Sequence, residues 1–101
     1  MSGQIDVREA VCAIIAQNGD VEGLVSAMRS GDLRAAARAW SGSPAVKSGA
    51  FPPIDTDADD DEIAKGFRQR MRIARISAKG NPARIADFVE AMSAAVRAAG
   101  T

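Results

Sequence analysis

Short breaks recur at close intervals in the first 42 residues, and they limit the length of any helix there. The segments GDVEGLVSAMRS and GDLRAAARAWSG repeat a Gly-Asp pair twelve residues apart, at Gly19-Asp20 and Gly31-Asp32. Glycine accepts the left-handed backbone conformation in which many helices end, and aspartate is a preferred N-cap. The pattern therefore predicts three short helices joined by two tight corners, with the third helix ending at Ser41-Gly42.

Each of these short segments has an apolar stripe at helical spacing, and no stretch alternates with period two over enough residues to predict a strand. In the first segment, Asp6 and Glu9 form a capping box ahead of the apolar residues. Cys12 lies within the same apolar pattern, so we expect it to be a small buried residue. The stripes consist of Val7, Ala10, Val11, Ile14 and Ile15; Val21, Leu24, Val25 and Met28; and Leu33, Ala36, Ala37 and Trp40.

An irregular segment separates the short helices from the rest of the chain. Residues 43–58 contain Pro44, Gly49 and the Pro52-Pro53 pair, which oppose a continuous helix, so we expect a loop. Two alternatives remain open for this loop from the sequence alone. Either Phe51 and Ile54 pack on the core and order it, or the loop is mobile.

The last part of the chain has two longer helical patterns. The first begins near Asp59 and runs to about Ala78, and the second follows Asn81, with Pro82 at a favoured first helical position. A short KGNP connection between them predicts an antiparallel hairpin packed across the earlier helices. We therefore predict one all-α domain of four to five helices over residues 1–101, with helices in 1–42, a loop in 43–58 and a helical hairpin in 59–100. The predicted buried residues are Val11, Ile14, Ile15, Leu24, Val25, Met28, Leu33, Trp40, Phe67, Met71, Ile85, Phe88, Val89 and Met92.

The composition argues against most kinds of catalytic and metal site. Histidine is absent and Cys12 is the only cysteine, which excludes histidine-activated nucleophiles, histidine-ligated zinc and a disulfide within the chain. The acidic run DTDADD begins like a calcium-binding EF-hand loop, but Asp60 stands where glycine is required and Gly66 where a bidentate glutamate is required. We expect no catalytic residues, no cofactor and no metal, and hence a protein that is not an enzyme.

The most distinctive charge pattern lies in residues 55–80, where six acidic residues precede six basic ones. On a helical wheel five cations share one flank, with spacings of three, four, three and four residues over roughly 21 Å. Ile73 and Ile76 lie outside the apolar arc of the same helix, which indicates that this helix is covered on more than one side. The candidate binding residues are therefore Lys65, Arg68, Arg72, Arg75, Lys79, Ile73 and Ile76.

Several interpretations of this basic stripe compete. The plainest is a solvated helix whose acids and bases follow its dipole. The functional hypothesis is a non-enzymatic interaction or regulatory protein that docks on an acidic protein partner, because arginine binds carboxylates through paired hydrogen bonds. One alternative is nucleic-acid binding through phosphate contacts, although 13 basic and 13 acidic residues leave no net charge. The other is a homo-oligomer that uses Ile73, Ile76 and the Ala-rich C-terminal helix.

The expected location follows from features that the chain lacks. No basic region followed by an apolar stretch stands at the N-terminus, and no apolar run approaches the length of a membrane span. We therefore expect a cytoplasmic protein with no membrane partner. The abundance of alanine, arginine and glycine is typical of bacterial or phage sequences.

Overall fold

The computed structural model describes residues 7–16, 20–77 and 82–100, and six helices account for most of these residues. The described part contains no strand, so the predicted all-α class is confirmed. The residues Asp6, Asn18, Gly19 and Asn81, to which the sequence assigned caps and corners, lie outside the described part. The helices are α1 (Val7–Ile15), α2 (Val21–Arg29), α3 (Leu33–Ser41), α4 (Pro44–Lys47), α5 (Asp60–Ser77) and α6 (Pro82–Gly100).

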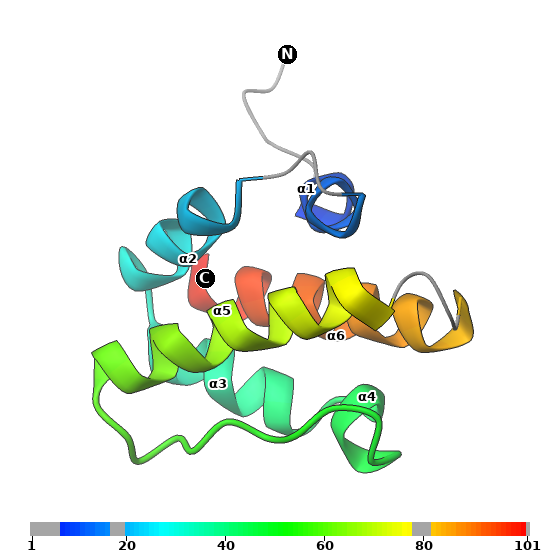
Figure 1. The fold of residues 1–101 in the computed structure, drawn as a ribbon. Helices are drawn as coiled ribbons and strands as arrows, with labels where there is room; N and C mark the ends of the chain where they lie inside the picture. Colours follow the sequence, from blue (N-terminus) through cyan, green and yellow to red (C-terminus); the bar gives the residue numbers. More distant parts are fainter. Residues whose placement is uncertain (1–6, 17–19, 78–81, 101) are drawn as a thin grey trace.

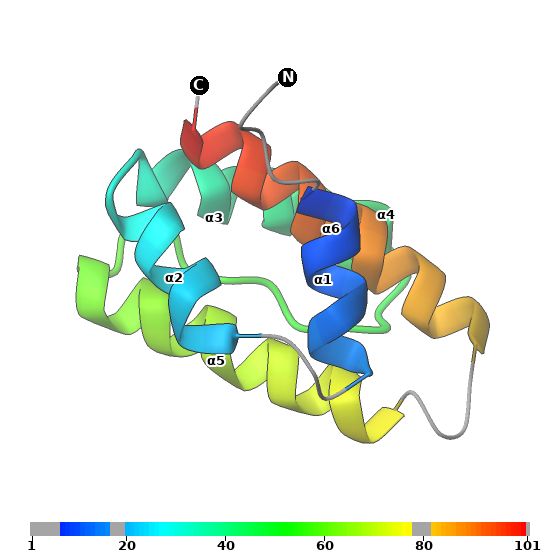
Figure 2. The same ribbon diagram turned by 90° about the horizontal axis from the view of Figure 1, so that it is seen from above.

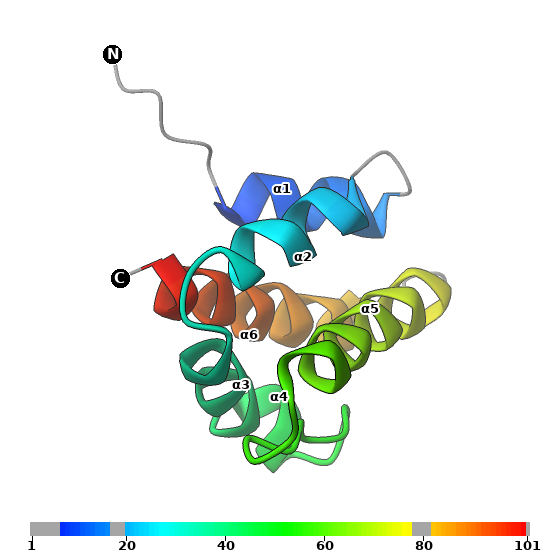
Figure 3. The ribbon, with the colours of Figure 1, turned by 90° about the vertical axis from the view of Figure 1, so that its left-hand side faces the viewer.

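The two long helices occupy the middle of the molecule, between the shorter ones. Helices α1 and α2 lie on one side of α5 and α6, while α3 and α4 lie on the other side (Figures 1 and 3). Helices α5 and α6 run in opposite directions, but they diverge from their connected ends (Figure 2). The predicted antiparallel hairpin is therefore an open one, and α6 packs more extensively against α3 than against α5.

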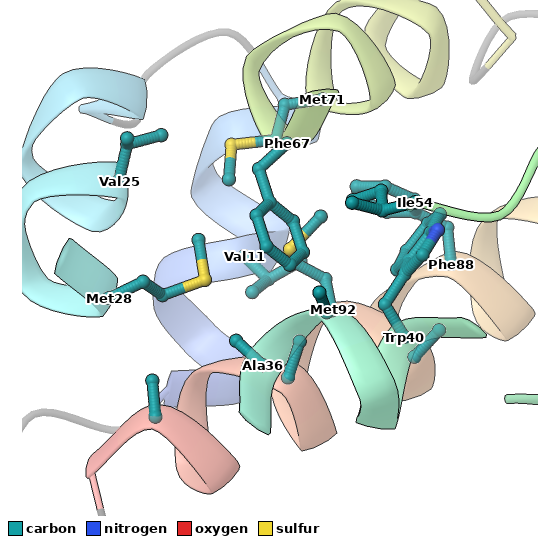
Figure 4. Packing of buried hydrophobic residues seen from close by; sticks show 14 of the residues in the cluster. Val11, Val25, Met28, Ala36, Trp40, Ile54, Phe67, Met71, Phe88 and Met92 are labelled. Carbon is teal, nitrogen blue, oxygen red and sulfur yellow. The ribbon is translucent and has the colours of Figure 1, made fainter. Parts of the chain in front are cut away.

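A group of four aromatic rings packs in the core. Figure 4 shows three of them, Trp40, Phe67 and Phe88. Trp40 of α3 meets Phe51, Phe67 and Phe88 edge-on, with ring centroids 5.9, 6.3 and 5.8 Å away. Edge-to-face contact is a favoured arrangement for aromatic rings. The indole Nε1 of Trp40 donates a hydrogen bond of 3.0 Å to the carbonyl oxygen of Pro52, so the buried ring leaves no polar group unpaired. Trp40 thus joins α3 to α5, α6 and the segment after α4.

The aspartates at both predicted corners cap helices as expected. The side chain of Asp20 accepts a hydrogen bond from the Gly23 N–H at 2.9 Å, and that of Asp32 accepts one from the Ala35 N–H at 3.1 Å. Gly31 serves a different purpose from the predicted left-handed helix end, since the φ angle of Gly31 is not positive. A Cβ atom on Gly31 would stand 2.0 Å from the carbonyl oxygen of Ala99, so the position requires glycine because the α6 backbone passes so close.

The predicted loop over residues 43–58 is ordered, and part of it is helical. Pro44 begins the single turn of α4, where the missing proline N–H costs nothing, and this turn is a departure from the expected loop. Gly49 then adopts a φ of 83°, a conformation that favours glycine, and the chain turns back toward the core. Phe51 and Ile54 are both buried there, which decides between the two alternatives left open by the sequence.

Most of the predicted buried set is confirmed, and one cysteine prediction is wrong. Ile15, Leu24 and Ile85 are half-buried, and the other eleven predicted core residues are buried. Cys12 is exposed, because Val11 and Ile14 occupy the inward positions of α1 and Cys12 is rotated away from them. The prediction was wrong because it considered only the apolar residues around Cys12 in the sequence. It did not consider which side of the helix Cys12 occupies.

Candidate interaction surface

Helix α5 carries the predicted site. It is a continuous helix over residues 60–77, and the predicted cations can share one flank only if the helix is regular. One side of this helix is completely buried, through Ile63, Ala64, Phe67, Met71 and Ala74. The helix begins with a cap in which the Asp59 side chain accepts a hydrogen bond from the Glu62 N–H at 2.9 Å. The acids of the first turn face the positive end of the helix dipole, which is a stabilising arrangement.

The five predicted cations do not form one continuous accessible stripe. Arg68 is half-buried, and its Nε donates to both carboxylate oxygens of Glu22 on α2, at 2.8 and 3.0 Å. Lys65 and Arg72 are exposed and Arg75 is half-buried, whereas Lys79 lies outside the described residues. Neither Arg72 nor Arg75 forms an ion pair with any residue that the structure describes.

Two isoleucines stand beside the available arginines. Ile73 is 38% exposed and Ile76 is 77% exposed, and they are the only exposed large hydrophobic residues in the described part of the chain. A single exposed apolar residue is ordinary on a protein surface, but here two lie three residues apart, on one side of a helix. The C-terminal half of α5 thus presents an apolar pair flanked by cations. We call Arg72, Ile73, Arg75 and Ile76 the α5 patch.

A different set of arginines, which the sequence analysis did not identify, holds the segment after α4 in place. Arg70 donates from Nε to the Pro52 carbonyl at 3.2 Å, from Nη2 to the Pro53 carbonyl at 2.7 Å, and from Nη1 to the Gly66 carbonyl at 2.9 Å. Burial lowers the pKa of Arg70 from its ordinary value. The signal available in the sequence was that Arg70 falls outside the basic stripe on the helical wheel.

Two further arginines bind the same segment from other helices. Arg34 of α3 donates from Nη1 to the carbonyl oxygen of Thr56 at 2.9 Å. Arg84 of α6 donates to the carbonyl oxygen of Ala50, and its guanidinium lies 5.2 Å from the centre of the Phe51 ring. These contacts fix residues 50–56 from three helices, so Arg34, Arg70 and Arg84 act as structural residues.

A recess of about 320 Å³ opens between this fixed segment and the first half of α5. Its lining combines apolar groups with charged groups of both signs. The Ile54 side chain packs against α5 at Gly66 and forms part of the wall of the recess. It lies 3.5 Å from the point where a Cβ of residue 66 would stand. The residues around the recess are Pro53, Ile54, Asp55, Ala58, Glu62, Lys65, Gly66, Gln69 and Arg70.

A second hollow, of about 360 Å³, lies between α1 and α2. It is more apolar than the first and is lined largely by small residues, among them Ala10, Ala13, Gly23 and Ala27. Leu24 forms part of its wall, which explains why this predicted core residue is only half-buried. Among the described residues that line this hollow, only Asp20 is charged, and its side chain caps α2.

The described residues do not bring the candidate metal ligands of the chain together. No cluster of three or more Cys, Asp or Glu side chains among them could hold a metal ion. Cys12 is exposed, and the chain has no histidine to activate it. Among the described helices, none combines the length and apolar character that crossing a membrane requires.

Comparisons with known proteins supply no relative for this chain. No protein-family model, no curated protein and no solved structure matches it. The assignment of a function therefore depends on the surface of this molecule alone.

Proposed function

We propose that this protein is a non-enzymatic interaction protein that docks on an acidic protein surface through the α5 patch. The observation that supports the proposal best is the exposure of Ile76, at 77%, beside arginines without an ion-pair partner in the described part. Removing such a pair of isoleucines from water stabilises a complex by roughly 25 cal/mol per Å² of apolar surface buried. The arginines add orientation, because a guanidinium binds a carboxylate through two parallel hydrogen bonds.

The proposal uses fewer residues than the sequence alone suggested. Arg68 is committed to Glu22, so the docking surface is centred on Arg72 and Ile76 rather than on a row of five cations. Lys65 lies two turns toward the acidic end of the helix, where it borders the recess. An acid-rimmed apolar site on a partner is therefore the surface chemistry that fits best.

Nucleic-acid binding is less favoured by the same surface. A phosphate backbone is followed by several aligned cations, and the α5 patch offers only two, Arg72 and Arg75, that form no ion pair with a described residue. The acidic first turn of α5 would repel a polyanion, and a chain with a net charge of zero has no overall attraction for one. No aromatic side chain is exposed in the described residues to stack on bases, since Trp40, Phe51, Phe67 and Phe88 are all buried.

A capture experiment with charge-matched variants tests the proposal. Immobilised wild-type protein is compared with Arg72→Glu/Arg75→Glu and with the control Arg38→Glu/Arg97→Glu, which changes the net charge equally on α3 and α6. We expect quantitative mass spectrometry to find acidic proteins retained by the wild type and the control but lost from the α5 variant. Retention of every partner by the α5 variant would refute the proposal. A salt titration with generic duplex DNA tests the alternative, and tight binding that the α5 variant abolishes would favour it instead.

A further inference from the structure

Helix α5 carries a protruding apolar pair and a recess on the same side, at opposite ends. The residues Glu62, Lys65, Gln69, Ile73 and Ile76 follow one another at spacings of three, four, four and three, so they form one row along the helix, and all are exposed. The first three border the recess of about 320 Å³, and the last two are the exposed isoleucines. Seen from above, α5 runs along one edge of the ribbon (Figure 2). The exposure of all five side chains leaves this row open to another molecule. We call these five residues the outer row.

The two ends of the outer row also differ in charge. The recess end has Asp55 and Glu62 at its border, with Asp57 and Asp60 exposed beside them. The isoleucine end has Arg72 and Arg75. Of the acids near the recess, only Asp61 forms an ion pair within the described chain, with Arg29 at 2.9 Å. The acidic end and the basic end of α5 are thus both available for contact with a second molecule.

We propose that the acidic surface recognised by the α5 patch belongs to a second copy of this chain, and that two α5 helices pair antiparallel across a twofold axis. This inference rests on the proposed function, because it assigns the partner of that same surface. Gln69 is the middle of the outer row, seven residues from Glu62 and seven from Ile76. An axis at the level of Gln69 therefore places Ile73 and Ile76 of each copy over the recess of the other.

The same symmetry matches the charges. Antiparallel pairing brings the basic end of each α5 to the acidic end of its partner, at both ends of the interface. Parallel pairing would place like charges together and leave both recesses unfilled. A twofold contact is also closed, because each copy uses its isoleucines and its recess once, so the assembly ends at two chains.

Other occupants fit fewer of these observations. A nucleic acid would contact the arginines but leave the acids and the recess without a role. An unrelated acidic helix would explain the arginines and isoleucines, but not the recess that lies along the same row. A second copy accounts for the isoleucines, the recess and both charged ends together.

The first test is the mass of the protein in solution. Size-exclusion chromatography with light scattering is expected to give about twice the chain mass of 10.5 kDa at micromolar concentration and low salt. Ile76→Asp is expected to give the mass of one chain, while the control Ala94→Asp, at an exposed position on α6, keeps the dimer. Circular dichroism checks that both variants stay folded. A monomer at every concentration up to millimolar, or a dimer unaffected by Ile76→Asp, overturns the inference.

The second test uses the exchange of charges between two copies. Arg72→Glu/Arg75→Glu makes both ends of α5 acidic. Asp57→Lys/Glu62→Lys reverses two of the charges at the recess end, so that they repel Arg72 and Arg75 of a second copy, and each variant alone is expected to be monomeric. Mixed together they restore opposite charges at both contacts, and a mixed dimer is expected in light scattering. The control mixture replaces the first variant by Arg38→Glu/Arg97→Glu, which has the same net charge but restores only one contact. This control keeps the wild-type α5 and is expected to form its own homodimer, so native mass spectrometry distinguishes the mixed dimer by its mass, and that mixed dimer is expected to be at least tenfold weaker.

The outcomes separate this inference from the proposed function. If the mixed variants remain monomeric but the capture experiment still loses an acidic protein with Arg72→Glu/Arg75→Glu, the second-copy inference is overturned and the docking function stands. If neither experiment responds to changes in the α5 patch, both are overturned. A mixed dimer formed at equal strength by the control mixture would show attraction by net charge alone, and would also overturn the antiparallel arrangement.

Discussion

The backbone N–H of Asp32 donates a hydrogen bond of 2.8 Å to the carbonyl oxygen of Ala99, and thereby ties the corner between α2 and α3 to the last turn of α6. Carbonyl groups in the last turn of a helix have no partner within the helix, so this contact satisfies one of them. The side chain of Asp32 meanwhile caps α3. The contact requires the α6 backbone to approach residue 31 closely, and glycine at that position makes the approach feasible.

Gly31→Ala is therefore expected to be strongly destabilising. The new Cβ would stand 2.0 Å from the Ala99 oxygen, which is backbone and cannot rotate away. We expect the free energy of unfolding to fall by about 2–3 kcal/mol, as for other overpacked sites. Urea unfolding followed by Trp40 fluorescence measures the change, because Trp40 is the only tryptophan and is fully buried.

Gly42→Ala is the matched control for that experiment. Gly42 also follows a short helix, but its φ is −88° and its Cβ would lie an ordinary 3.5 Å from the Arg38 oxygen. We expect its effect to stay within about 0.5 kcal/mol. Equal losses for the two variants would contradict the close-approach explanation of Gly31.

Gly66→Ala is expected to raise stability. Gly66 lies inside α5, where glycine costs roughly 0.5–1 kcal/mol relative to alanine. The Cβ would meet Ile54 at 3.5 Å and Nη1 of Arg70 at 3.4 Å, which are ordinary contact distances, so it fits with little adjustment. The urea midpoint should rise by an amount that corresponds to about 0.5–1 kcal/mol. A loss of stability would show that the recess beside Gly66 cannot accept a methyl group.

Much of the fold could be predicted from the sequence because local signals decide it. Asp20 and Asp32 act as caps through contacts three residues away, and the apolar stripes fix which side of each helix is buried. The role of Gly31 could not be predicted, since it depends on Ala99, far along the chain. Contacts between residues far apart in the sequence are what the sequence alone could not predict. Arg68 fits the basic stripe in the sequence, and only the folded chain brings Glu22 beside it.

Two serines that are buried in the described part of the chain are expected to respond in opposite ways to replacement by alanine. Ser93 on α6 is 1% exposed and its hydroxyl has no hydrogen-bond partner among the described residues, whereas the Ser43 hydroxyl donates to the Trp40 carbonyl oxygen at 2.6 Å. A buried hydroxyl without a partner is destabilising, so Ser93→Ala should raise the free energy of unfolding by about 1 kcal/mol. Ser43→Ala should lower it by a similar amount. Parallel urea titrations of the two variants measure both changes, and a loss for Ser93→Ala would reveal a partner for its hydroxyl in solution.

Arg70 and Arg72 lie two residues apart on α5, yet replacement by lysine should affect them very differently. The Arg70 guanidinium donates to three backbone carbonyls, two of them in the Pro52-Pro53 pair, and one ammonium group cannot reach all three. Because hydrogen bonds to a charged group contribute roughly 1.5–3 kcal/mol each, Arg70→Lys should lower the free energy of unfolding by about 2 kcal/mol. Arg72 is exposed and makes no ion pair with a described residue, so Arg72→Lys should change stability by less than about 0.5 kcal/mol. Amide hydrogen exchange adds a local measurement, since Arg70→Lys should increase exchange at Ile54, whose N–H donates to the Ser41 hydroxyl at 3.1 Å within the segment that Arg70 holds. Equal stability of the two lysine variants would mean that Arg70 is not needed to order this segment, and that the packing of Phe51 and Ile54 with the contacts of Arg34 and Arg84 is sufficient.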